Sequence, residues 1–229
     1  VRLLEMPGQH PYVYADWVRL PGAPTLLVYG HHDVQPPRRP EKWATPAFEP
    51  TARNGRLYGR GAVDDKGTFI THVAAARAWL ETSGRLPLNL KFLIEGEEEI
   101  GSPGLDAFLK RYGRLLSADV AVLADTGNFD VGHPALTYQL RGICQVDVEV
   151  RCLEQPVHSG FWGGPVPDAV RILAGLVASL EGEDGSLAIP GLYRTVAKTG
   201  ARQLCRIRSL PFQERKVRAS AAMRPGTRF

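Results

Sequence analysis

Few cysteines and no long apolar run set the first limits on this 229-residue chain. No run approaches the ~20 consecutive apolar residues that a membrane-spanning helix needs, so we expect no membrane partner. The start lacks the basic and then apolar layout of a secretory signal peptide, and it lacks an initiator methionine, so we expect the natural chain to begin earlier. Three widely spaced cysteines predict neither a disulfide framework nor a cysteine-type zinc site. These absences favour a reducing, cytoplasmic setting.

Acidic residues are scarce at the end of the chain. Residues 194–229 carry a net charge of +9, whereas residues 1–193 carry a net charge of −5. The sequence pI of about 9.1 is therefore a property of the tail, which we expect to be solvated and poorly ordered. The alternative is a nucleic-acid-binding arm. The tail has only Phe212 and Phe229 to stack on bases, so we do not expect nucleic acid to be a partner.

Apolar runs and helical periods alternate along the first half of the chain. Strand-like apolar runs occupy residues 12–20, 25–30, 88–94 and 119–124, and apolar residues at helical spacing occupy 66–84 and 104–116. This order predicts an α/β fold, a three-layer αβα arrangement with a mainly parallel sheet. The polar stretch 36–61, rich in proline and glycine, is expected to be a long surface loop.

The pattern changes near residue 134. Residues 135–152 alternate with period two, which predicts antiparallel strands. Residues 167–181 have the spacing of an amphipathic helix with a proline in its first turn. We therefore expect a second, smaller α+β unit to begin here.

Polar residues stand directly after the predicted strands and before the first long helix. They are His31, Asp33, Asp64, Asp65, Glu95, Glu97, Glu98, Glu99 and Asp125. In a parallel sheet these positions meet at the carboxyl edge, where open α/β folds build their sites. So many carboxylates at one edge would be unfavourable without compensation, and a pair of divalent cations would supply it.

The types of donor narrow the choice of metal. Imidazole and carboxylates without thiolate suit Zn²⁺, Mn²⁺ or Co²⁺ better than Ca²⁺. Each motif alone has an ordinary explanation: His-x-Asp as a surface pair, "DDKG" as a helix N-cap, and a glutamate run as a solvated face. Their joint placement at the strand ends is what favours a metal site.

Five motifs carry a resemblance to a known family. "YGHHDVQPP", "GRLYGRGAVDDKG", "LIEGEEEIGS", "VLADTG" and "PVHSGFWGG" occur in the order typical of the di-zinc metallopeptidases that include aminoacylase, carnosinase and carboxypeptidase G. The chain most resembles the dipeptidase branch, over residues 1–193. The resemblance implies a hydrolase that cleaves the amide bond of small peptides by metal-bound hydroxide with a glutamate as general base. It also implies a homodimer with two zinc ions per subunit, which Mn²⁺ or Co²⁺ could replace.

The resemblance also implies domain limits. Residues 1–134 would be the N-terminal part of the catalytic domain, and residues 135–193 would begin a lid and dimerisation domain. Residues 194–229 would be the basic tail.

The resemblance assigns the metal ligands residue by residue. His31 and Asp125 would hold one zinc, Glu99 would hold the other, and Asp64 would bridge both, in a family where the peptide bond after this aspartate is typically cis.

Catalytic roles follow from the same resemblance. Asp33 would hold the ring of His31, and Glu98 would be the general base. His158 would reach the site of the partner subunit and stabilise the oxyanion. Glu95 and Glu97 would have no catalytic role and would flank the site as surface or support.

One expected ligand has no counterpart. The family supplies a further histidine to the zinc that Glu99 holds, and this chain has no histidine after His158. We therefore expect a chain truncated at its C-terminus, with impaired hydrolysis. The alternatives are an N-acyl-amino-acid deacylase or carboxypeptidase with the same metal site, or a catalytically inactive remnant.

This departure predicts unequal metal sites. We expect the chain to bind one zinc more tightly than any second, because the second keeps only Asp64 and Glu99. Metal counting by atomic emission on the purified chain measures this. Two tightly held zinc ions per chain, with dipeptide turnover, would contradict it.

Overall fold

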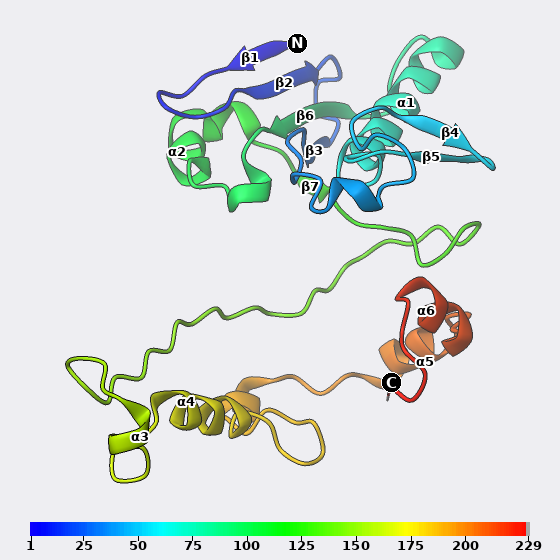
Figure 1. Ribbon diagram of the computed structural model, residues 1–229. Helices are drawn as coiled ribbons and strands as arrows, with labels where there is room; N and C mark the ends of the chain where they lie inside the picture. Colours follow the sequence, from blue (N-terminus) through cyan, green and yellow to red (C-terminus); the bar gives the residue numbers. More distant parts are fainter. Residues whose placement is uncertain (228–229) are drawn as a thin grey trace. The chain divides into compact units, whose positions relative to one another are not determined.

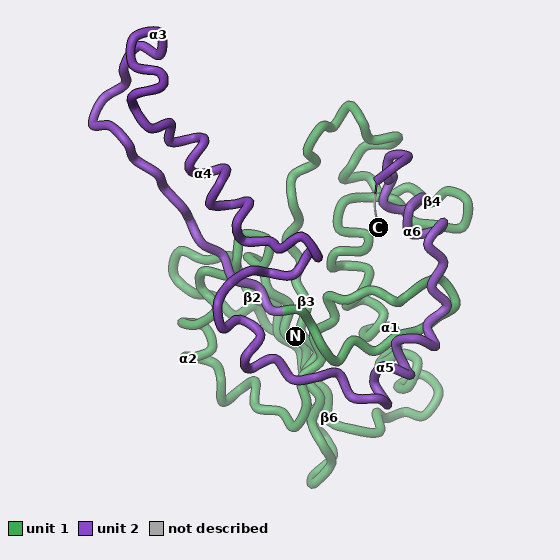
Figure 2. The backbone as a smooth tube through the Cα atoms, turned by 90° about the horizontal axis from the view of Figure 1, so that it is seen from below, with its two compact units in different colours: residues 1–141 green, residues 142–229 purple. Residues whose placement is uncertain are grey.

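The computed structural model describes residues 1–227 and divides into two compact units, with the boundary in the sequence between Arg141 and Gly142 (Figure 2). The domain limits predicted at residues 134 and 193 stay predictions. Within the described part of the chain, no helix combines the length and apolar character needed to cross a bilayer.

The first unit is built on a five-stranded sheet in the order β1–β2–β6–β3–β7 (Figure 1). The strands are β1 (Arg2–Leu4), β2 (Tyr12–Trp17), β3 (Thr25–His31), β6 (Asn89–Glu95) and β7 (Val120–Leu123). β6, β3 and β7 run parallel, whereas β1 and β2 extend the sheet in antiparallel pairing. The predicted α/β class is confirmed, although the sequence patterns did not indicate β1.

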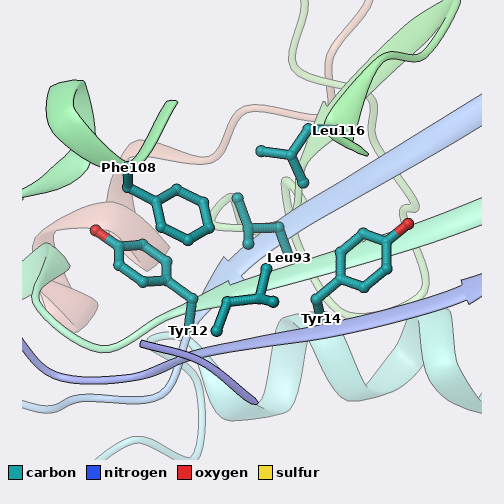
Figure 3. Close-up of a cluster of buried hydrophobic side chains, with 6 residues drawn as sticks. Tyr12, Tyr14, Leu93, Phe108 and Leu116 are labelled. Atoms are coloured by element: carbon teal, nitrogen blue, oxygen red, sulfur yellow. The ribbon is translucent and has the colours of Figure 1, made fainter. Parts of the chain in front are cut away.

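Two helices cover opposite faces of this sheet. Phe108 and Leu116 of α2 (Leu105–Leu116) pack with Leu93 and the tyrosines of β2 (Figure 3). Phe69 of α1 (Lys66–Ser83) packs with Val28 on the other face. Alternate residues of the central strands therefore face different helices, which gives the predicted three layers.

Two polar side chains of β6 tie the central strand to its neighbours. Asn89 exchanges four hydrogen bonds of 2.9–3.1 Å with the backbone of residues 19–23, which connect β2 to β3. Lys91 donates to the carbonyl oxygens of Leu115 and Ser117 at the end of α2. The amino-terminal half of β6 is therefore fixed from two sides.

The predicted loop over residues 36–61 contains a hairpin. β4 (Thr51–Arg53) and β5 (Arg56–Tyr58) pair antiparallel, and a 3₁₀ turn covers Pro40–Lys42. Asn54 and Gly55 join the two strands with φ of 52° and 71°. An Asn-Gly pair suits such a turn because both central residues need positive φ. The loop prediction is therefore wrong for residues 51–58.

The antiparallel strands predicted over residues 135–152 do not form in the described part of the chain. Leu136, Leu140 and Ile143 are 79%, 80% and 95% exposed. Alternation with period two describes a surface that fits a sheet, but a strand is held by hydrogen bonds to a neighbour. No strand forms a ladder of hydrogen bonds with this segment among the described residues, so the prediction is wrong for this structure.

The second unit is helical. It contains α3 (Ser159–Trp162), α4 (Ala169–Ala178), a 3₁₀ turn (Leu192–Thr195), α5 (Ala201–Arg208) and α6 (Glu214–Ser220). Asp168 caps α4, accepting hydrogen bonds from the backbone N–H groups of Val170 and Arg171. The segment predicted to be a poorly ordered tail thus includes two short helices.

Buried tyrosines predict a loss of stability at alkaline pH. Burial, with added repulsion from Glu95 and Glu97, raises the pKa of Tyr12 to about 12. A raised folded-state pKa contributes stability that is present below pH ~10 and lost as the pH rises towards 12, at ~1.4 kcal/mol per pH unit. The Tyr12 hydroxyl has no hydrogen-bond partner among the described residues. Tyr12→Phe should therefore change little at pH 7 and flatten the alkaline loss. Urea unfolding from pH 7 to 12 measures this, and equal alkaline slopes in both proteins would contradict it.

Candidate active site

The carboxyl ends of the three parallel strands bring the predicted site residues together. β3 ends at His31 and β6 at Glu95, which pair in register, and Asp125 follows β7 by two residues. Asp64 and Asp65 directly precede α1, and the peptide bond between them is cis. Four separate segments therefore meet at one edge, the usual ligand-binding position in open α/β sheets.

The His31 imidazole is completely buried, and both its nitrogens face oxygen atoms. Nδ1 lies 3.1 Å from the carbonyl oxygen of Asp33 and 3.3 Å from its Oδ1. Nε2 lies 2.9 Å from Asp64 Oδ1, and 3.9 Å from both Glu98 Oε2 and Asp125 Oδ2. If the ring proton is on Nδ1, it donates a hydrogen bond to Asp33. The lone pair of Nε2 then points towards the other carboxylates, which is the arrangement that a metal ligand needs.

Donor atoms of His31, Glu98 and Asp125 lie within 4.8 Å of one another, a spacing that one cation can bridge. Burial lowers the pKa of His31, but the surrounding carboxylates, Glu98 first, outweigh it, so this pKa lies above its ordinary value. Burial and then neighbouring carboxylates raise the pKa of Glu98 and of Asp125. The carboxylates therefore repel one another, and a divalent cation among them would relieve that repulsion.

Asp65 supports His31 from the α1 side of the sheet. Its side chain is completely buried, and its Oδ2 accepts a hydrogen bond from the His31 backbone N–H at 3.0 Å. Burial raises the pKa of Asp65 to about 6. Gly30 makes room for this carboxyl, because a Cβ on Gly30 would lie 2.5 Å from Asp65 Oδ2. Asp65 therefore fixes the backbone of His31 without being one of the three grouped donors.

Glu99 lies outside the group of three donors. It follows Glu98 in a 3₁₀ turn (Glu98–Ile100), and its carboxylate and carbonyl oxygens accept hydrogen bonds from Gln35. Its backbone N–H donates to Asp33 Oδ2 at 3.0 Å. Of the two glutamates predicted as base and ligand, Glu98 is thus the one whose carboxylate approaches His31. The predicted roles of both stay predictions.

Glu95 and Glu97 are buried, so the prediction that they are flanking surface residues is wrong. The other interpretation, that they support the site, remains. Glu95 is completely buried, and its Oε2 accepts a hydrogen bond from the Tyr29 hydroxyl at 2.6 Å. Burial, together with this carboxylate, raises the pKa of Tyr29. Glu97 accepts a hydrogen bond from the backbone N–H of His10 at 3.0 Å. The two side chains hold the backbone on either side of Gly96.

His158 belongs to the second unit. Its side chain is exposed, its Nδ1 accepts a hydrogen bond from the Gly160 N–H at 3.0 Å, and its ring lies 5.1 Å from that of Phe161. It therefore caps α3 in this structure, and its predicted catalytic role stays a prediction.

A groove of about 760 Å³ runs along β7, beside the site. Its lining is formed by β7 residues, the first turns of α1 and residues 135–140. His31, Glu98 and Asp125 do not line it, so it is distinct from the donor group.

Gln35 and Tyr29 are polar contacts of the site that the sequence patterns did not single out. Gln35 lies within "YGHHDVQPP", and Tyr29 lies two residues before His31, on the same face of β3. The alternation of the strand could have indicated Tyr29. Gln35 has no such periodic signal, because it lies beyond the end of the strand.

The α/β sheet carries a histidine and several carboxylates at the carboxyl ends of its parallel strands, which is the arrangement of a candidate metal site. Residues 27–201 match the sequence model of a family described as peptidase family M20/M25/M40. The chain belongs to this family.

Particular relatives narrow the comparison. The cysteinylglycine-S-conjugate dipeptidase of Corynebacterium striatum is 42% identical over 179 residues, which cover 78% of this chain and 39% of that protein. The crystal structure of human carnosine dipeptidase 1 has a TM-score of 0.67 and 32% identity, covering 93% of this chain and 46% of that chain. A metallo-carboxypeptidase of Sulfolobus solfataricus has a TM-score of 0.77 and 27% identity, covering 100% and 51%. The chain therefore spans about two fifths to one half of these relatives' lengths.

Gly67 is the residue on which the entry into α1 depends. A Cβ on Gly67 would overlap the backbone carbonyl oxygen of Ala62, in the turn that carries Asp64. Gly67→Ala should therefore lower the free energy of unfolding by ~1–3 kcal/mol, the usual cost of overpacking. Urea denaturation measures the change.

The matched control is Gly113→Ala in α2. A Cβ on Gly113 meets open space, so the substitution should stabilise the helix by ~0.5–1 kcal/mol. If both variants unfold at the same urea concentration, the steric argument for Gly67 is incorrect.

Proposed function

We propose that this chain belongs to a metal-dependent dipeptidase, in which the residues around His31 hold divalent cations and hydrolyse the amide bond of small peptides. The observation that carries the proposal is the group of His31, Glu98 and Asp125 donor atoms, with Asp64 Oδ1 2.9 Å from the same histidine nitrogen.

The donor set fits a divalent cation. One imidazole nitrogen faces three carboxylates, the groups carry no thiolate, and burial together with repulsion among the carboxylates raises the pKa of Glu98 and Asp125. Zn²⁺ suits such donors, with Mn²⁺ or Co²⁺ as substitutes. His31, Asp64 and Asp125 would hold one cation, and Asp64 and Glu99 would contribute to a second. A bound cation supplies Lewis acidity towards the substrate carbonyl and lowers the pKa of water.

The protein's own side chains would then handle the proton. Glu98 would take a proton from the attacking water through its carboxylate and deliver it to the amine that leaves. Asp33 would keep the His31 ring oriented by accepting the hydrogen bond from Nδ1. His158, supplied by the partner subunit of a homodimer, would stabilise the oxyanion. The cytoplasmic setting is part of the same proposal.

Dipeptides are the substrate class that the relatives favour. The names of the C. striatum and human relatives specify dipeptide substrates, at 42% and 32% identity, whereas the S. solfataricus structure, at 27%, is named a carboxypeptidase. Mouse and rat relatives, at 38% and 36% identity, are named Beta-Ala-His dipeptidases. We therefore favour a dipeptidase over a carboxypeptidase or deacylase.

The two adjacent glutamates provide the sharpest test. Glu98→Gln should leave the zinc content of the chain unchanged and lower any dipeptide turnover about 10²–10⁴-fold, because it removes the base and keeps the shape. Glu99→Gln should instead lower the zinc content. Equilibrium dialysis against zinc, followed by atomic emission and a dipeptide assay, measures both.

Glu81→Gln is the control, since Glu81 pairs with Arg77 on the exposed face of α1. It should leave zinc content and turnover unchanged. Loss of zinc in Glu98→Gln with retention in Glu99→Gln would reverse the two roles. A wild-type chain that takes up no divalent cation would overturn the proposal.

A further inference from the structure

Gln35 makes a three-point contact with Glu99. Its side-chain Nε2 donates to Glu99 Oε2 at 3.0 Å and to the Glu99 carbonyl oxygen at 2.7 Å, and its backbone N–H donates to Glu99 Oε1 at 3.3 Å. Both residues are half-buried, so the contacts are only partly open to competition from water. One residue therefore engages the main chain and both carboxylate oxygens of Glu99.

The same segment also holds His31. Asp33 faces the Nδ1 atom of His31 with its carbonyl oxygen and Oδ1, and its Oδ2 accepts a hydrogen bond from the Glu99 N–H. Residues 33–35 therefore connect the histidine at the end of β3 to the glutamate that follows β6. A shift of this segment would move both side chains together.

Two prolines stiffen the segment on its far side. Gln35 precedes Pro36, which disfavours helical backbone at Gln35, and Pro37 follows. The Arg38 N–H closes the turn by donating to the Pro36 carbonyl oxygen at 2.8 Å. The backbone at Gln35 is therefore restricted even without the contact to Glu99. This restriction reduces the conformational entropy that is lost when the contact forms.

We propose that Gln35 is a positioning residue that orients the Glu99 carboxylate towards a divalent cation. This inference rests on the proposed function, in which Glu99 is a metal ligand. An uncharged amide suits the task, because it holds the carboxylate by hydrogen bonds and leaves its negative charge for the cation, whereas a lysine or arginine would neutralise it. The shorter carboxylate contact falls on Oε2, at 3.0 Å, and Oε1 accepts a single contact of 3.3 Å, so Oε1 is the less firmly held oxygen.

Gln35→Met tests this role, because methionine keeps the length of the side chain and removes the amide. Cobalt titration, followed by its visible absorption, should show about 10–100-fold weaker binding at the site that contains Glu99, the usual effect of losing a partner of a metal ligand. Affinity at the site that contains His31 should change less than about twofold. The melting temperature of the protein in chelator should stay close to that of the wild type.

A double-mutant cycle separates positioning from a general effect on structure. In a Glu99→Gln background, Gln35→Met should cause no further loss of cobalt affinity. Gln155→Met, at an exposed position of the second unit, is the matched control and should bind cobalt as the wild type does.

Three outcomes would overturn the inference. Unchanged cobalt affinities in Gln35→Met would contradict the proposed role of Gln35, whereas the proposed metal centre would be unaffected. An equal loss at both sites with a lower melting temperature would show a structural role only. A wild-type chain that binds no cobalt or zinc would overturn the metal centre itself, and the role of Gln35 with it.

Discussion

Both nitrogens of the His31 ring face oxygen atoms, and the ring is closed off from water. A buried imidazole in contact with Asp33 and Asp64, with two further carboxylates 3.9 Å away, is favourable only if positive charge is shared among them. The parallel pairing of β3 with β6 and β7 creates this situation, because it brings the ends of all three strands to one edge. The topology that stabilises the core therefore also gathers these carboxylates around one imidazole.

The remaining buried acids of the site have local partners. Glu95 accepts the hydrogen bond of Tyr29 from the adjacent strand, and Asp65 accepts that of the His31 backbone from the start of α1. Each carboxyl still has one oxygen without a hydrogen-bond partner among the described residues. A buried polar atom without a hydrogen bond carries a desolvation penalty that lowers the stability of the fold. We therefore interpret these contacts as fixing the strand ends rather than as adding net stability.

The sequence predicts those elements whose signal is local. It does not predict structure that depends on a contact with residues far away in the sequence. The runs at 25–30 and 88–94 predicted β3 and β6, because apolar strands buried between helices carry their own pattern. The hairpin at Asn54 and Gly55 also has a local signal, the Asn-Gly pair, although it lies within a polar stretch rich in proline and glycine. Residues 135–152 had the pattern of strands, but pairing depends on a neighbour that the pattern cannot specify. The positions of Glu95, Glu97 and Glu99 in "EGEEEIGS" likewise depend on residues far away in sequence, which are Tyr29, His10 and Gln35, respectively.

Proximity alone would make Glu98 the metal ligand, whereas the hydrogen bonds favour Glu99. Both oxygens of the Glu99 carboxylate accept hydrogen bonds from N–H groups of Gln35, which fix the orientation that a metal ligand needs. A general base must instead gain and release a proton, so fixed donors on its oxygens would hinder it. The Glu98 carboxylate accepts no hydrogen bond from the described residues, and its Oε2 lies 3.9 Å from His31 Nε2. The two adjacent glutamates therefore differ in hydrogen bonding more than in distance, and that difference supports the proposal of Glu98 as the general base and Glu99 as a metal ligand.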